Sequence, residues 1–268
     1  MIRDLVSPWL TAISAADSTR AQRSFRARHA ALLESLRLAR AAALESLPLP
    51  TDTERLHRLA QRAADPETQQ LLRDAAGHAA ALGANRCDVI SLFAGDASGS
   101  AGESLLRPEA QIVLFVELAA NVNELIVALA AAIAPLTRWS GPNPILRDRW
   151  EAARALPLRE WIYTEGLGLH LAAALLPDLS PHQLLGVNHA AFTRLREREK
   201  IFRTLLDADL DERGIGLPLR WLAPDAPIGP RTVGDVVLPP AAGRYLAWRM
   251  TADRVERMGL REALQAES

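Results

Sequence analysis

Residues 125–136 read LIVALAAAIAPL and form the longest apolar run of the chain. Asn121 and Glu124 precede it at the spacing of a capping box, with Asn in place of the usual Ser or Thr. The pattern therefore predicts a helix over about 121–136. Pro135 is expected to end or bend that helix, because proline lacks an amide N–H and clashes with the carbonyl four residues back.

Two short runs of β-branched and aromatic residues come before this helix. Residues 89–93 read VISLF and residues 112–116 read IVLFV, so both are expected to be strands. The Gly- and Ser-rich residues 95–102 between them predict a loop that has neither a phosphate-binding pattern nor a nucleophile elbow. The expected fold class is therefore α+β and predominantly helical, with a small sheet over about 88–117.

The first 85 residues are expected to be helical throughout and to form a region separate from a domain at 86–268. One long helix is predicted from Ser18 to the prolines near residue 48, and a second over about 53–64. Asp65-Pro66 supplies an N-cap and a first-turn proline, which predicts a third helix to about residue 82. Further along the chain, helices are expected at about 146–155, 158–176, 180–200 and 243–258, with a long loop at 214–230.

Composition limits the classes of protein to consider. With 268 residues and 49% hydrophobic composition, the chain can bury a large core as one domain or as two closely packed lobes. Cys87 is the single cysteine, which excludes an intrachain disulfide and a cysteine-based zinc site. There is no signal-peptide pattern, and the longest apolar run is shorter than the roughly 20 residues of a membrane-spanning helix. We expect a cytoplasmic protein with no membrane contact.

Basic residues gather on the first long predicted helix, mostly off its apolar stripe; they are Arg20, Arg23, Arg26, Arg37 and Arg40. The formal net charge of the chain is -1, and nucleic-acid binding normally requires a basic excess on some face. We therefore prefer to interpret these arginines as a solvated helix face, partly balanced by Glu34 and Glu45. A nucleic-acid groove is the alternative.

The central predicted helix lacks the side chains of a metal site. Two histidines at i and i+4 share a helix face because four residues turn by about 400°, and zinc needs this convergence plus a third ligand. A glutamate after the first histidine serves as general base on metal-bound water. At this spacing the chain has Ala131 and Pro135 in the ligand positions and Ala132 in the base position.

The order of motifs nevertheless resembles the DUF2268 group of zinc-dependent proteases, over roughly residues 85–260. The resemblance is carried by the DVISL strand at 88–92, the Gly/Ser loop, the strand at 112–117, the helix at 121–136, the TEGL sequence at 164–167 and the GRYLAWRM sequence at 243–250. It implies a zincin-like fold with His-Glu-x-x-His on the central helix and a downstream Glu in a Glu-Gly-Leu context.

Carried over by position, the resemblance assigns the first ligand to Ala131, the base to Ala132 and the second ligand to Pro135. Only the third ligand, Glu165, has a matching residue. We therefore expect no catalytic residue and no bound cofactor, but a vestigial cleft formed by these four residues with Tyr245 at its rim, able to bind a peptide or protein partner. If Glu165 is buried opposite the alanines, it needs Arg138, Arg244 or another donor.

Two alternatives stay open at this point. The first is an active metal-dependent hydrolase with a relocated site around Glu165, His170, His182 and His189, in which the metal ligands are Glu165, His182 and His189. His182 and His189 are seven residues apart and would share a face of one helix. The second is a non-enzymatic helical protein with a regulatory or nucleic-acid-binding role.

Overall fold

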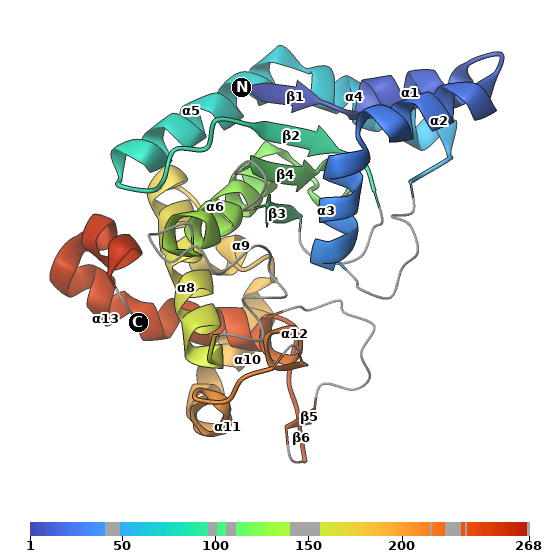
Figure 1. Cartoon of the computed structure of the whole chain (residues 1–268). Coiled ribbons are helices and arrows are strands. Elements are labelled where there is room, and N and C mark those ends of the chain that lie inside the picture. The colour runs from blue at the N-terminus through green and yellow to red at the C-terminus, as the bar shows by residue number, and fades with distance from the viewer. Residues whose placement is uncertain are drawn as a thin grey trace.

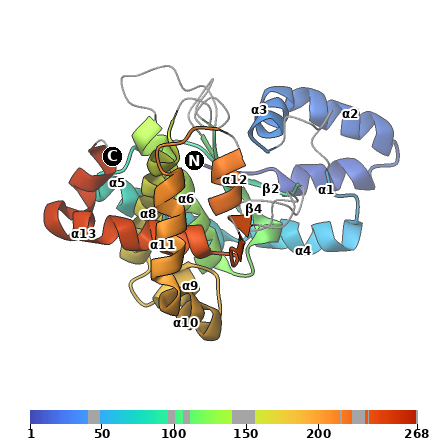
Figure 2. The same cartoon turned by 90° about the horizontal axis from the view of Figure 1, so that it is seen from below.

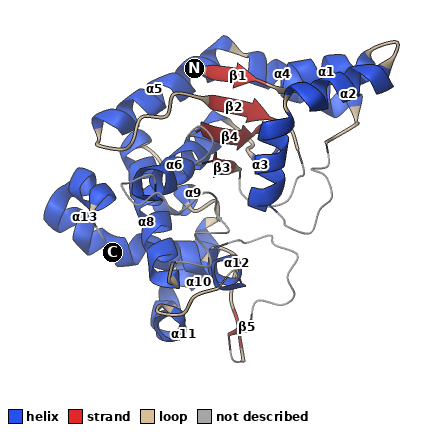
Figure 3. Cartoon of the chain, viewed as in Figure 1, coloured by secondary structure: helices blue, strands red, loops and turns tan. Residues whose placement is uncertain are grey.

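The computed structural model is a mostly helical α+β fold with a small four-stranded mixed sheet and a two-stranded hairpin (Figures 1 and 3). It describes residues 1–40, 49–95, 101–105, 111–139, 156–214, 216–222, 232–233 and 235–266. Within these ranges the chain forms 12 helices of the α type. The expected fold class, α+β and predominantly helical, is confirmed at this level.

The main sheet has the strand order β1-β2-β4-β3. Its strands are β1 (Ile2–Asp4), β2 (Ile90–Phe93), β3 (Gly102–Leu105) and β4 (Gln111–Phe115). β1, β2 and β4 run parallel, whereas β3 pairs antiparallel with β4 at the edge. The two predicted strands are confirmed as β2 and β4. β3 was not expected, and residues 96–100 of the predicted loop lie outside the described residues.

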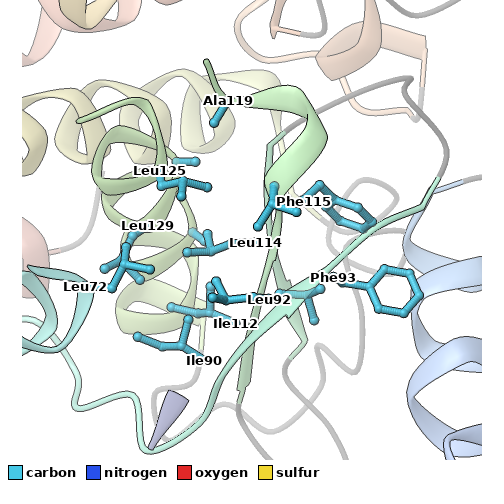
Figure 4. Packing of buried hydrophobic residues seen from close by; sticks show 14 of the residues in the cluster. Leu72, Ile90, Leu92, Phe93, Ile112, Leu114, Phe115, Ala119, Leu125 and Leu129 are labelled. Carbon is cyan, nitrogen blue, oxygen red and sulfur yellow. The ribbon is translucent and has the colours of Figure 1, made fainter. Parts of the chain in front are cut away.

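One face of the sheet is covered by α6 (Val122–Trp139) (Figure 4). Alternate strand residues point to this face because the side-chain period of a strand is two. They are Ile90 and Leu92 of β2 and Ile112 and Leu114 of β4, none more than 2% exposed, and they pack toward Leu125 and Leu129 of α6. Phe93 and Phe115 point to the other face, with their rings edge to face at 5.8 Å.

The N-terminal region is helical except for β1. Its helices are α1 (Val6–Ser14), α2 (Ser18–Arg28), α3 (Ala30–Arg40), α4 (Thr53–Ala64) and α5 (Pro66–Ala81). α4 and α5 confirm the predictions, with Asp52 and Asp65 as N-caps.

Two expectations for the N-terminal region were wrong. The first residues form β1, whose partner strand β2 lies far along the chain, and the Met1 amino group donates to the Asp88 carbonyl at 2.5 Å. The predicted single long helix breaks at His29, where the backbone angles are φ -109° and ψ 20°. α2 and α3 are therefore separate helices, and the predicted end near residue 48 lies outside the described residues.

α6 begins with the predicted cap and runs past the predicted end. The Glu124 amide donates to the side chain of Asn121 at 3.0 Å, and the Glu124 carboxylate accepts from the Ala120 amide at 2.6 Å. Pro135 lies inside the helix, which continues to Trp139. α6 is long and apolar enough to cross a membrane by length and composition alone, but 61% of that window is buried, as in the core helix of a soluble protein.

The C-terminal half is almost wholly helical. Its elements are α8 (Leu158–Leu175), α9 (Pro181–Leu184), α10 (His189–Glu197), α11 (Glu199–Asp209), α12 (Gly216–Leu222), the hairpin strands β5 (Thr232–Val233) and β6 (Val236–Val237), and α13 (Ala242–Gln265). α8 confirms its prediction. α9, α10 and α11 replace the predicted single helix from residue 180 to 200, and α12 lies in the predicted long loop. The helix predicted at 146–155 is outside the described residues.

Buried hydrophobic residues form two clusters, and α8 contributes to both. The first cluster joins the sheet, α1, α4, α5 and α6, and includes Leu167 and Leu171 of α8. The second joins α11, α12 and α13, and includes Trp161 and Ile162 of α8. β1 pairs with β2 across residue 85, and the first cluster contains residues from both sides of it. The division of the chain into two regions at residue 85 stays a prediction.

Candidate functional site

Ala131, one of the positions named by the resemblance, lies where α6 packs against α8. A Cβ added at Gly168 of α8 would stand 3.1 Å from the Cα of Ala131 and 3.5 Å from the Cβ of Ala134. Arg138, further along α6, reaches back to Glu160 near the start of α8. Higher residue numbers on α6 therefore meet lower numbers on α8, so the two helices are antiparallel.

This register brings Glu165 within about one helical turn of the two expected ligand positions on α6. Ala131 lies beside Gly168, and Pro135, one turn further along α6, faces a level one turn earlier on α8. Glu165 occupies that interval of α8. Both Ala131 and Pro135 are only partly buried.

Ala132, the expected base position, faces a different neighbour. It is 2% exposed and lies one turn after Ala128, and residues four apart share a helix face. A Cβ added at Gly102 of β3 would stand 2.4 Å from the Ala128 carbonyl oxygen, so this face of α6 packs on the edge strand. A side chain larger than alanine at position 132 would enter a packed region.

The carboxylate of Glu165 is paired with Arg244 of α13. The Nε atom of Arg244 donates to Oε1 of Glu165 at 2.8 Å, and both side chains are 19% exposed. Nη1 of Arg244 also donates to the Leu185 carbonyl at 3.4 Å. One of the two donors expected from the sequence therefore supplies the opposite charge, and this guanidinium stands where a metal-binding carboxylate would need a cation.

The other expected donor, Arg138, serves a second ion pair. Its guanidinium binds Glu160 and donates to the Ala266 carbonyl at 2.8 Å, with side-chain exposures of 4% for Arg138 and 13% for Glu160. Two guanidinium groups lie over the ring of Tyr163, that of Arg138 at 5.2 Å and that of Arg254 at 4.7 Å from the ring centroid. This cluster joins the ends of α6 and α13 to α8.

Tyr245 lies in the second core and not at a rim beside Glu165. Its side chain is 1% exposed, and its hydroxyl donates to Oε2 of Glu199 at 2.6 Å. Burial, together with the hydrogen bond to Glu199, raises the pKa of Tyr245. The phenol therefore stays protonated and holds the start of α11 against α13, which differs from the expected contact with a bound peptide.

The histidines of the relocated-site alternative separate into two places. The rings of His182 and His189 are 5.5 Å apart but belong to different short helices, and His182 is 3.0 Å from the hydroxyl of Ser180. His170 instead contacts the Trp248 carbonyl at 3.1 Å through Nε2. In the described ranges no group of three His, Cys, Asp or Glu side chains is placed to hold a metal ion. Glu165 does not join His182 and His189 as a third ligand.

The packing and hydrogen-bonding roles of two residues at this site were not predicted from the sequence. Gly166 permits close approach, since an added Cβ would stand 2.2 Å from the Ala247 carbonyl oxygen of α13. Glu199 is one acid within a mixed-charge stretch, and only its contact with Tyr245 distinguishes it. The TEGL motif did point to Gly166, but as part of a family pattern and not as a packing requirement.

The three expected positions on α6 carry alanine and proline, whose side chains offer no ligand atom or base. The Glu165 carboxylate is paired with Arg244. A site of this kind can recognise a partner through hydrogen bonds and charge. No family model, curated protein or solved structure matches this chain.

Proposed function

We propose that this chain is a pseudoenzyme, a non-catalytic homologue of the DUF2268 zinc-dependent proteases that works in the cytoplasm. In this proposal, the face around Glu165 and Arg244 binds an extended peptide segment, either free or as part of a protein partner. The strand β4 and the helix α6 follow one another in the chain at the positions that the resemblance assigns to them. No cofactor takes part.

One observation carries the proposal. Glu165 is distant in sequence from Ala131 and Pro135, yet the antiparallel register of α6 against α8 brings it within about one helical turn of their level. Such a coincidence is expected if they descend from metal-ligand positions. Arg244 then replaces the lost cation, because a carboxylate that is 19% exposed is costly to keep charged without a partner.

The relocated hydrolase is less well supported by the geometry. It requires Glu165 to join His182 and His189, whereas Glu165 is bound by Arg244 and the two histidines interact with each other. The peptide-binding role rests on the resemblance, because the corresponding face of a protease receives its substrate.

Restoring the metal site tests the ancestry. The variant combines Ala131→His and Pro135→His with Arg244→Ala, and leaves Ala132 unchanged because that position is packed. Zinc content is measured after dialysis, with circular dichroism to show that the variant is folded. We expect the variant to bind one zinc ion and to lose affinity when Glu165→Gln is added. The unsubstituted protein should show no change in melting temperature with zinc or chelator.

Two results would overturn this part of the proposal. A folded variant without zinc would mean that Glu165 does not lie opposite the former ligand positions. Stoichiometric zinc in the unsubstituted protein, with peptide hydrolysis that a chelator abolishes, would mean that the chain is an enzyme.

The binding role needs a separate measurement. A displayed library of random peptides is panned against the protein, and the affinity of selected peptides is measured for Arg244→Gln and for Arg58→Gln. Arg58 is a matched control because it is an exposed arginine paired with Glu54 on α4. We expect a consensus peptide whose binding weakens only in the Arg244 variant. Absence of a consensus, or equal binding by both variants, would reject this face as a peptide site.

A further inference from the structure

α2 carries four arginines and no acidic residue. It reads STRAQRSFRAR, and Arg20, Arg23 and Arg28 are exposed while Arg26 is partly buried. The helix lies with α1 at the far end of the molecule from α11 and α13 (Figure 2). This position leaves it accessible without any change in the two cores.

Packing of α2 on α1 leaves two arginines on the opposite side of the helix and a third at the edge of that side. Phe25 is 6% exposed, and its ring lies 5.2 Å from that of Trp9 on α1. At about 100° per residue, Arg20 and Arg23 fall on the face opposite Phe25. Arg26 lies at the edge of that face, with its guanidinium 5.7 Å from the centroid of the Trp9 ring. The three arginines span about 9 Å along the helix axis.

The charge of these three arginines is not neutralised within the described residues. None of Arg20, Arg23 and Arg26 forms an ion pair with a carboxylate that the structure describes. The Asp17 side chain caps the helix by accepting from the Arg20 amide at 3.0 Å. The break at His29 also places Glu34 on another helix, α3, and not on the helix that carries the three arginines.

We propose that the arginine row of α2, defined as Arg20, Arg23 and Arg26, binds the phosphodiester backbone of a nucleic acid. Guanidinium groups suit this partner because their planar donors match phosphate oxygens in pairs. A membrane surface fits less well, since a helix bound to lipid needs an exposed apolar face. On α2 the large apolar residue, Phe25, is already buried against α1.

The salt dependence of binding follows from the number of phosphate contacts. For a DNA duplex, log K falls against log salt with a slope of about -0.9 per contact, so three arginines give a slope of about -2.7. Between about 50 and 200 mM salt the affinity should fall about 40-fold. Contacts of this kind do not read base sequence, so duplexes of unrelated sequence should bind equally.

The test measures the fluorescence anisotropy of a labelled DNA duplex titrated with the full chain at several salt concentrations. We expect binding at low salt and a loss of about one unit of slope for each arginine replaced by glutamine. The variant is Arg20→Gln with Arg23→Gln and Arg26→Gln. Because Arg26 also lies over the Trp9 ring, its replacement can disturb the packing of α2 on α1. The double variant of Arg20→Gln and Arg23→Gln keeps this contact and is measured in parallel.

A control variant removes the same charge elsewhere, through Arg58→Gln, Arg159→Gln and Arg203→Gln, three arginines in ion pairs on other helices. For this control variant, the slope of log K against log salt should be the same as for the unsubstituted protein. The proposal is overturned if the chain does not bind the duplex at low salt, or if both variants lose binding equally. Tighter binding to vesicles of anionic phospholipid, lost in the α2 variant, would also overturn it and identify a membrane surface instead.

Discussion

Replacing Gly166 by alanine should destabilise the protein, although alanine is the better helix former. Gly166 lies inside α8, where Gly→Ala normally adds about 0.5–1 kcal/mol. Here the new Cβ would stand 2.2 Å from the Ala247 carbonyl oxygen and 2.5 Å from Oγ1 of Thr251. Ordinary contact begins at 3.4 Å, so α8 and α13 must separate by about 1.2 Å or distort.

The magnitude follows from these two opposing effects. Overpacking of a well-packed interior costs about 1–3 kcal/mol, and the partner atoms here include backbone, which cannot rotate away. The backbone contact places the cost in the upper half of this range, about 2–3 kcal/mol. After the helix gain is subtracted, we expect a net loss of about 1–2.5 kcal/mol in the free energy of unfolding, or about 2–10 °C in melting temperature. Denaturant unfolding followed by circular dichroism and tryptophan fluorescence measures it.

Two other helical glycines supply matched controls. Gly77 in α5 has nothing within 4 Å of an added Cβ, so Gly77→Ala should raise stability by about 0.5–1 kcal/mol. A Cβ added at Gly168 would stand 3.1 Å from the Cα of Ala131, so the stability change of Gly168→Ala should lie between those of Gly166→Ala and Gly77→Ala. If Gly166→Ala is as stable as Gly77→Ala, the close packing of α8 on α13 is wrong.

Three further predictions concern side-chain contacts. Glu165→Gln should lower the free energy of unfolding by about 1–2 kcal/mol. Arg244→Gln should then destabilise the Glu165→Gln variant less than it destabilises the unsubstituted protein. A double-mutant cycle with no coupling would exclude the ion pair. Tyr245→Phe should cost about 1 kcal/mol because Glu199 loses a hydrogen bond, and unchanged stability would count against that contact. Burial lowers the pKa of His170 from 6.5, so the unfolded chain takes up this proton first and stability falls as the pH drops below 6.5. His170→Gln should flatten that fall in urea unfolding measured across the pH range, and an unchanged pH profile would contradict it.

Elements with strong local signals were predicted well from the sequence. α5 is an example, because Asp65 caps it, Pro66 fits its first turn, and neither depends on distant residues. β1 and β3 were missed because they are short and exist through pairing with β2 and β4, which pattern alone does not show. Pro135 was expected to end or bend α6. The helix does not end there, and it packs on the sheet and on α8 as it continues to Trp139.

The candidate site was anticipated only in part, since its contacts join distant segments. Arg244 was one of two expected partners for Glu165, and the choice between them depends on how α13 crosses α8. Tyr245 was expected at a rim because it belongs to a motif of the resemblance, yet it is buried by the second core. The break at His29, which places the α2 arginines apart from Glu34, has no glycine or proline to mark it.

Because α8 supplies buried residues to both hydrophobic clusters, neither cluster can unfold alone without exposing part of this helix. Leu167 and Leu171 would lose their neighbours if the sheet side opened, and Trp161 and Ile162 if the α11–α13 side opened. The two halves should therefore unfold as one cooperative unit, with the amides of α8 among the slowest to exchange with solvent. Opening near the sheet would then affect the packing at the far end of the molecule through α8 and through α13, which also contributes to both clusters.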